Sequence, residues 1–148
     1  LSVENPSKLV FPFYDGNGMF LSSGNIQEVG KVGWLLIDFE TPNRLRIQGN
    51  ATVSKASELL ERFPGAIMVT IIDVTVVFVN CARYIHPHKR IETSRYIPDA
   101  DGKQHFPAWK RIDKIQPALP AKDQGQAESE GGIIDNDQYI DLIMTGKS

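Results

Sequence analysis

Residues 44–53 read RLRIQGNATV and decide the fold class, because apolar and polar side chains alternate along them. Leu45, Ile47, Gly49, Ala51 and Val53 share one face, and a polar face begins with Arg44 and Arg46. This period of two predicts a β-strand with one buried side. The preceding run at 32–39, VGWLLIDF, predicts a second strand joined to the first by a turn. We expect an antiparallel hairpin, with both faces of 32–39 covered because that run is nearly all apolar.

Upstream of this hairpin, residues 8–13 (KLVFPF) predict another strand. Pro12 has no N–H group to donate, so we expect an edge, a bulge or the end of the strand there. The glycine-containing turn at 14–18 follows, and residues 19–29 predict a short helix with an imperfect apolar stripe.

Downstream, residues 54–63 predict a helix of one or two turns. Residues 67–79 are rich in Val and Ile and predict one long strand or a bent pair, with the bend at Asp73. Five or six antiparallel strands with short helices indicate a mainly β fold, and the long strand favours a small β-barrel.

The periodicity fades after Arg83. A helix is predicted at 108–115, and 122–132 (KDQGQAESEGG) has the composition of a polar linker. An acidic segment with apolar residues at 133–144 is predicted to dock as a helix or strand. We therefore expect a barrel domain over 1–120 and a linker with a C-terminal tail over 121–148.

Composition narrows the class of protein. The chain has 148 residues, 41% of them hydrophobic, with a net charge of −2, which suits one globular domain and argues against nucleic-acid binding. The single cysteine, Cys81, excludes an intrachain disulfide and indicates a reducing, cytoplasmic location; we expect a buried, inert thiol. The apolar stretch at 66–82 is interrupted by Asp73 and Asn80, so we expect no membrane span.

The turn at 15–18, Asp-Gly-Asn-Gly, directly precedes the helix predicted at 19–29. A glycine turn that feeds a helix start exposes backbone N–H groups and a partial positive charge, which suits a phosphate. The alternative is an ordinary hairpin turn, because Asp-Gly and Asn-Gly favour that geometry.

Arg44 and Arg46 lie on the same face of their strand, about 7 Å apart. Two guanidinium groups in that position can hold a phosphate or polarise the edge of a heteroaromatic ring. The alternative is a solvated face, where such charges contribute little.

Other polar groups are weaker candidates. His86, His88 and His105 offer too few supporting ligands to predict a zinc site. The basic residues between 83 and 95 are expected to be solvated. The sequence has no nucleophile elbow, Walker loop or dinucleotide-binding glycine pattern.

Several of these segments occur in an order that is typical of one family. They are 9–20 (LVFPFYDGNGMF), 24–26 (GNI), 32–36 (VGWLL), 44–51 (RLRIQGNA), 80–87 (NCARYIHP) and 106–113 (FPAWKRID). Together they resemble the pyridoxamine 5'-phosphate oxidase-related family of FMN-binding split barrels, over about 9–120. The resemblance implies a six-stranded split barrel whose first strands precede Leu1. It also implies a homodimer that binds FMN in a cleft between its subunits.

The resemblance also implies the site residues. Backbone groups at Pro12 and Phe13 would line the isoalloxazine ring, and Asn17, Gly18 and Met19 would lie near the ribityl phosphate. Arg44 would touch the flavin ring, Arg46 would follow it on the same face, and Trp109 would close over the site.

One departure from the family concerns the phosphate. The oxidase itself has Ser-Arg-Lys where this chain has Asn17, Gly18 and Met19, so two cations are absent. Backbone amides at the helix start are the expected substitute. The residues that hold the oxidase's own substrate are not recognisable.

The resemblance therefore implies an FMN-dependent oxidoreductase that acts on a small, unidentified molecule. The alternatives are a split barrel that binds flavin or haem without catalysis, and a scaffold that needs no ligand.

Overall fold

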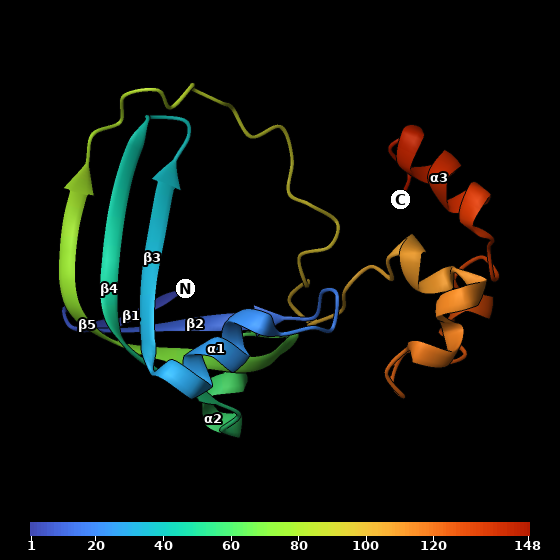
Figure 1. Ribbon diagram of the computed structural model, residues 1–148, viewed down its shortest axis with the longest axis horizontal. Helices are drawn as coiled ribbons and strands as arrows, with labels where there is room; N and C mark the ends of the chain where they lie inside the picture. Colours follow the sequence, from blue (N-terminus) through green and yellow to red (C-terminus); the bar gives the residue numbers. More distant parts are fainter. The chain divides into compact units, whose positions relative to one another are not determined.

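Figure 1 shows the computed structural model, which describes all residues from Leu1 to Ser148. Contacts divide the chain into two compact units. The sheet unit comprises Leu1–Ser94 and Asp99–Lys103, and the C-terminal unit comprises Arg95–Pro98 and Gln104–Ser148. The expected boundary at residue 120 lies inside the C-terminal unit.

The sheet unit is mainly β, as the alternation predicts. One antiparallel sheet has the strand order β1-β2-β5-β4-β3. Its strands are β1 (Ser2–Asn5), β2 (Lys8–Tyr14), β3 (Lys31–Asp38), β4 (Asn43–Ser54) and β5 (Ala66–Asn80), and its helices are α1 (Leu21–Val29) and α2 (Ser57–Leu60).

The predicted hairpin is confirmed. β3 and β4 pair in an unbroken register from Lys31 opposite Asn50 to Asp38 opposite Asn43. Burial alternates along β4 as its sequence predicts. The prediction that both faces of β3 are covered is wrong within this chain, because one face stays exposed and includes Leu35, 39% exposed.

β5 is the long strand, and it is strongly curved in Figure 1. It pairs with β2 over Ala66–Asp73 and with β4 over Val69–Asn80. The register against β4 slips at Thr75, because Gly49 lies opposite Val74 and Gln48 opposite Val76. The irregularity is a β-bulge two residues beyond the expected bend at Asp73.

The core lies between the sheet and α1. Its buried members are Leu9, Ile26, Ile47, Ala51 and Ile72. α1 ends because Gly30 adopts a left-handed conformation (φ 67°) and its N–H group donates to Ile26 O at 2.8 Å. Gly30 O then accepts from Ala51 N at 3.0 Å, which fixes the end of α1 on β4.

The C-terminal unit consists of short helical turns. They are η1 (Ala108–Arg111), η2 (Asp113–Ala118), η3 (Gln126–Glu128) and α3 (Asn136–Met144). The helix predicted at 108–115 is instead two 3₁₀ helices that meet at Ile112, which has extended backbone. Within the segment at 133–144, residues 136–144 form a helix, and Asp135 and Gln138 make a capping box at its start.

Residues 122–132 are packed, although their composition predicts a linker. Asp123 is 5% exposed and Ala127 is 1% exposed. Asp123 Oδ2 accepts from the buried Lys110 Nζ at 2.8 Å, and the Lys110 ammonium also lies 5.7 Å from the Trp109 ring. Such a pair adds little net stability, because desolvating both charges is costly. No helix in either unit is long and apolar enough to cross a membrane.

Candidate functional site

The loop between β2 and α1 carries the first group of predicted site residues. Asn17 Oδ1 accepts from Met19 N at 3.0 Å, which closes a local turn. Gly18 has φ 74°, a conformation that glycine adopts without strain. The chain then enters α1, so the alternative of an ordinary hairpin turn is wrong.

The first turn of α1 has no side chain that caps it or neutralises its partial positive charge. Phe20 precedes it with φ 48°, no side chain caps it, and its first turn has no acidic residue. Phe20 O accepts from Gly24 N at 3.0 Å and from Ser23 Oγ at 2.8 Å. The N–H groups of this turn have no intrahelical acceptor, so an anion would be favoured here.

A pocket of about 350 Å³, the loop pocket, lies beside this turn. Lys55 is the only cation that lines it. The lining residues are Met19, Phe20, Ser23, Gly24, Gln27, Val53, Lys55 and Met68. Sequence reasoning missed Lys55 because 36 residues separate it from Met19. Only the strand register, with Phe13 opposite Met68 and Ser54 opposite Val69, brings the two together.

Pro12 and Phe13 lie at the same end of the sheet. Pro12 is opposite Val69, and Val69 is opposite Ser54, the neighbour of Lys55. Of the eight predicted residues, Met19 lines the loop pocket, whereas Pro12, Phe13, Asn17 and Gly18 belong to the strand and loop that lead to it.

Arg44 and Arg46 lie at the opposite end of β4. Arg46 Nε donates to Asn80 Oδ1 at 2.7 Å, and Arg44 Nε donates to Cys81 O at 2.9 Å. Both guanidinium groups therefore fasten the end of β5 to β4. Cys81 is exposed, so the prediction that its thiol is buried is wrong.

This separation matters for any shared ligand. Arg44 and Val53 are nine residues apart on β4, or about 30 Å along an extended strand. A mononucleotide is shorter than this length of strand, so we do not expect the loop and Arg44 of one chain to contact the same flavin. Trp109 lies in η1 of the C-terminal unit, and its predicted role stays a prediction.

The β3–β4 turn is held by its own polar groups. Asp38 accepts from Glu40 N at 2.9 Å, from Thr41 N at 3.2 Å and from the Thr41 hydroxyl. These bonds, the hydroxyl's first, hold the pKa of Asp38 below its ordinary value. Beside this turn, His88 N donates to Phe39 O at 2.8 Å, and the two rings meet edge to face. No three His, Cys, Asp or Glu side chains are grouped to hold a metal ion.

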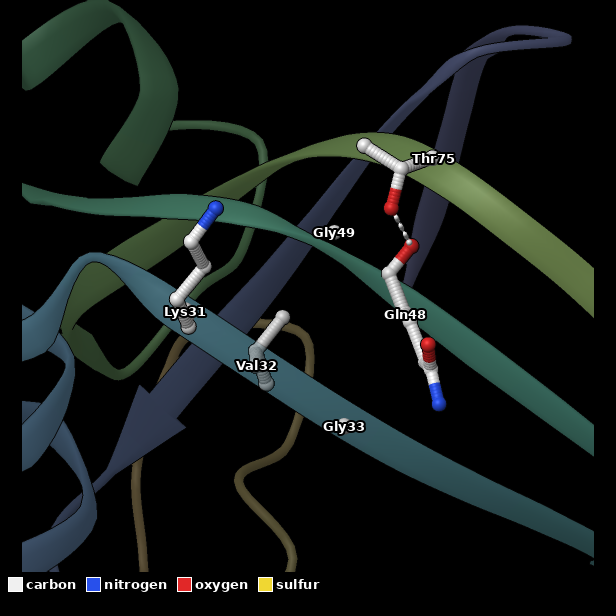
Figure 2. Close-up of a pocket in the computed structure, with 6 residues that line it drawn as sticks. All are labelled: Lys31, Val32, Gly33, Gln48, Gly49 and Thr75. Carbon is white, nitrogen blue, oxygen red and sulfur yellow. Dashed lines mark hydrogen bonds between the residues drawn. The ribbon is translucent and has the colours of Figure 1, made fainter.

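A second depression, the strand hollow, has a volume of about 400 Å³ and lies where β3, β4 and β5 run together. Figure 2 shows its lining residues: Lys31, Val32, Gly33, Gln48, Gly49 and Thr75. Thr75 Oγ1 donates to Gln48 O at 3.1 Å and so holds the bulge in place. No motif in the sequence marks these residues as a group.

No protein-family model matches the sequence, and no curated protein matches it. Function is therefore inferred from the residues and the geometry described above.

Proposed function

We propose that this chain is an FMN-binding split-barrel protein that acts as an oxidoreductase, with each flavin site shared between two copies. The observation that carries this proposal is the uncapped start of α1 beside the loop pocket. It is the arrangement expected for a phosphate, and it occurs at the position that the resemblance assigns to the ribityl phosphate.

At the phosphate end, backbone donors and one side chain would replace the cations missing from the loop. The N–H groups of the first turn of α1 supply partial positive charge. Lys55 supplies a full positive charge from the end of β4, and no hydrogen bond or ion pair engages its ammonium. A phosphate in the loop pocket would therefore have both kinds of donor.

At the ring end, the second copy is needed. Because the loop pocket and Arg44 lie at opposite ends of β4, the flavin ring would lie against Arg44 of the partner subunit. The surface around Arg44 suits such an interface. Four apolar residues at the end of β5 are between 38% and 76% exposed, although a folded monomer usually buries such side chains. They are Val76, Val77, Phe78 and Val79.

When bound, FMN would supply hydride transfer to or from a small molecule. The chain's own contribution would be placement and charge. A guanidinium beside the ring favours negative charge on it, and the bonds of Arg44 and Arg46 to the end of β5 hold both groups in place in advance.

The test is an absorption spectrum of the purified chain followed by titration with FMN. We expect flavin bands that shift on binding, and about tenfold weaker binding in Lys55→Gln. Lys103→Gln is the matched control, because Lys103 is exposed and lies outside the loop pocket. A chain that binds no FMN, or a haem band in place of flavin bands, would overturn the proposal. Unchanged affinity in Lys55→Gln would remove Lys55 from the site.

A further inference from the structure

Gly33 is a glycine that the chain itself does not require. It lies inside β3, where the register against β4 is unbroken, so it marks no bulge. Its φ is not positive, and a Cβ added there would meet nothing within 4 Å. Glycine weakens a strand interior and otherwise marks the close approach of a ligand or another backbone. By contrast, Gly49 is needed, because a Cβ there would lie 2.5 Å from Asp73 O.

The side chains around Gly33 leave its backbone uncovered. Lys31 and Leu35 are its neighbours two residues away on the same face of β3, and Gln48 lies directly opposite on β4. Figure 2 shows Lys31 reaching from β3 toward β4, where its ammonium donates to Asn50 Oδ1 at 2.7 Å. The Gln48 carboxamide makes no hydrogen bond, so both its donor and its acceptor are available.

The two ends of this face differ in composition, and Arg46 lies among the apolar residues of the second end. Lys31 and Gln48 form the polar end, whereas Leu35 and Phe78, both paired with Arg46, are 39% and 38% exposed. Lys31 and Leu35 are about 13 Å apart along the strand, a length that suits a fused three-ring system. A carboxamide that both donates and accepts matches the alternating C=O and N–H groups of a pyrimidine edge.

We infer that the strand hollow over Gly33 is the shelf for the flat flavin ring, with Gln48 recognising its pyrimidine edge and Leu35 contacting its benzenoid end. This inference rests on the proposed function and adds residues to it. The ring on each shelf would belong to the FMN whose phosphate is held by the loop pocket of the other copy. Arg46, two residues from Gln48 on the same face, would lie beside that ring.

The experiment places a side chain in the strand hollow without disturbing the fold. In Gly33→Val, the new side chain occupies open space and has higher strand propensity, so circular dichroism and the thermal midpoint should be unchanged or improved. We expect FMN affinity to fall at least tenfold. Thr52→Val is the matched control, because Thr52 is an exposed residue on the same face of β4 outside the hollow, and its affinity should stay within twofold.

Riboflavin, which lacks the phosphate, distinguishes the two ends of the site. Gly33→Val should weaken riboflavin and FMN alike, whereas Lys55→Gln should weaken FMN alone. If the wild-type chain binds FMN and Gly33→Val binds it equally well, the shelf is wrong and the proposed function stands. If the wild-type chain binds no FMN, the proposed function fails and the shelf fails with it.

Discussion

The two halves of β5 have similar apolar composition and opposite environments. In the inner half, Ala66–Asp73, Val69 is 0% exposed, and Thr70 and Ile72 are each 1% exposed. In the outer half, Val74–Asn80, Val77 is 52% exposed and Val79 is 76% exposed. Burial therefore does not follow from side-chain type alone.

Strand pairing and contacts with other elements account for the difference in burial between the two halves. The inner half lies between β2 and β4, whereas the outer half pairs with β4 alone. α2 adds further contacts to β5, while the outer half exposes apolar side chains on both faces. An apolar strand exposed on both faces is typical of an interface, which makes this half the natural contact for a second copy.

The largest expected effect is in the inner half. Ile72→Ala should lower the free energy of unfolding by about 2–5 kcal/mol, because it leaves a cavity among fully buried neighbours. Val77→Ala in the outer half should cost less than about 1 kcal/mol in a monomer, since Val77 is half exposed. Urea denaturation at low protein concentration measures both variants. Equal losses in the free energy of unfolding would show that the two halves do not differ in burial.

An intermediate effect is expected on self-association. Val79→Glu places a charge on the most exposed apolar residue of the outer half and should weaken a dimer at least tenfold. Sedimentation velocity over a concentration series measures this change. Circular dichroism should show the fold intact. A stable dimer has a dissociation constant well below tens of micromolar. A wild-type chain that stays monomeric at that concentration would therefore contradict the shared site.

The smallest effect concerns two threonine hydroxyls, one in each half. Thr70 Oγ1 is buried and has no hydrogen-bond partner, so Thr70→Val should stabilise the chain by about 1 kcal/mol. Thr75 Oγ1 donates to Gln48 O, so Thr75→Val should destabilise it by up to about 1 kcal/mol. Thermal unfolding of both variants gives the sign. A Thr70→Val protein that is less stable would show that its hydroxyl has a partner in solution.

The sequence predicts local structure well where one period dominates. The alternation at 44–53 gives the hairpin and its two faces, and the left-handed Gly18 turn leads into a helix as expected. It does not predict neighbours across the sheet. Lys55 reaches the loop pocket through the β2–β5–β4 pairing, whereas Arg44 lies at the opposite end of β4.

Composition is also a poor guide to packing in short segments. Residues 122–132 contain one apolar residue with a side chain, Ala127, yet they bury it together with Asp123. The ion pair to Lys110 and the hydrogen bonds from Arg111 to Gly131 O and Gly132 O hold that segment, and no periodicity in the sequence predicts them. Trp109, by contrast, lies in a helical turn as the sequence predicts, although the turn is 3₁₀.

Residues 95–103 thread through both units before the chain continues into η1. Arg95–Pro98 belongs to the C-terminal unit, whereas Asp99–Lys103 returns to the sheet unit. Gly102 (φ 78°), in the segment at 99–103, packs against the turn at Gly65. The contact is so close that a Cβ on Gly102 would lie 2.6 Å from Gly65 N. A protease cut after Ser94 would therefore leave the sheet fragment without a piece of its own surface. Truncations meant to isolate the sheet should keep every residue through Lys103.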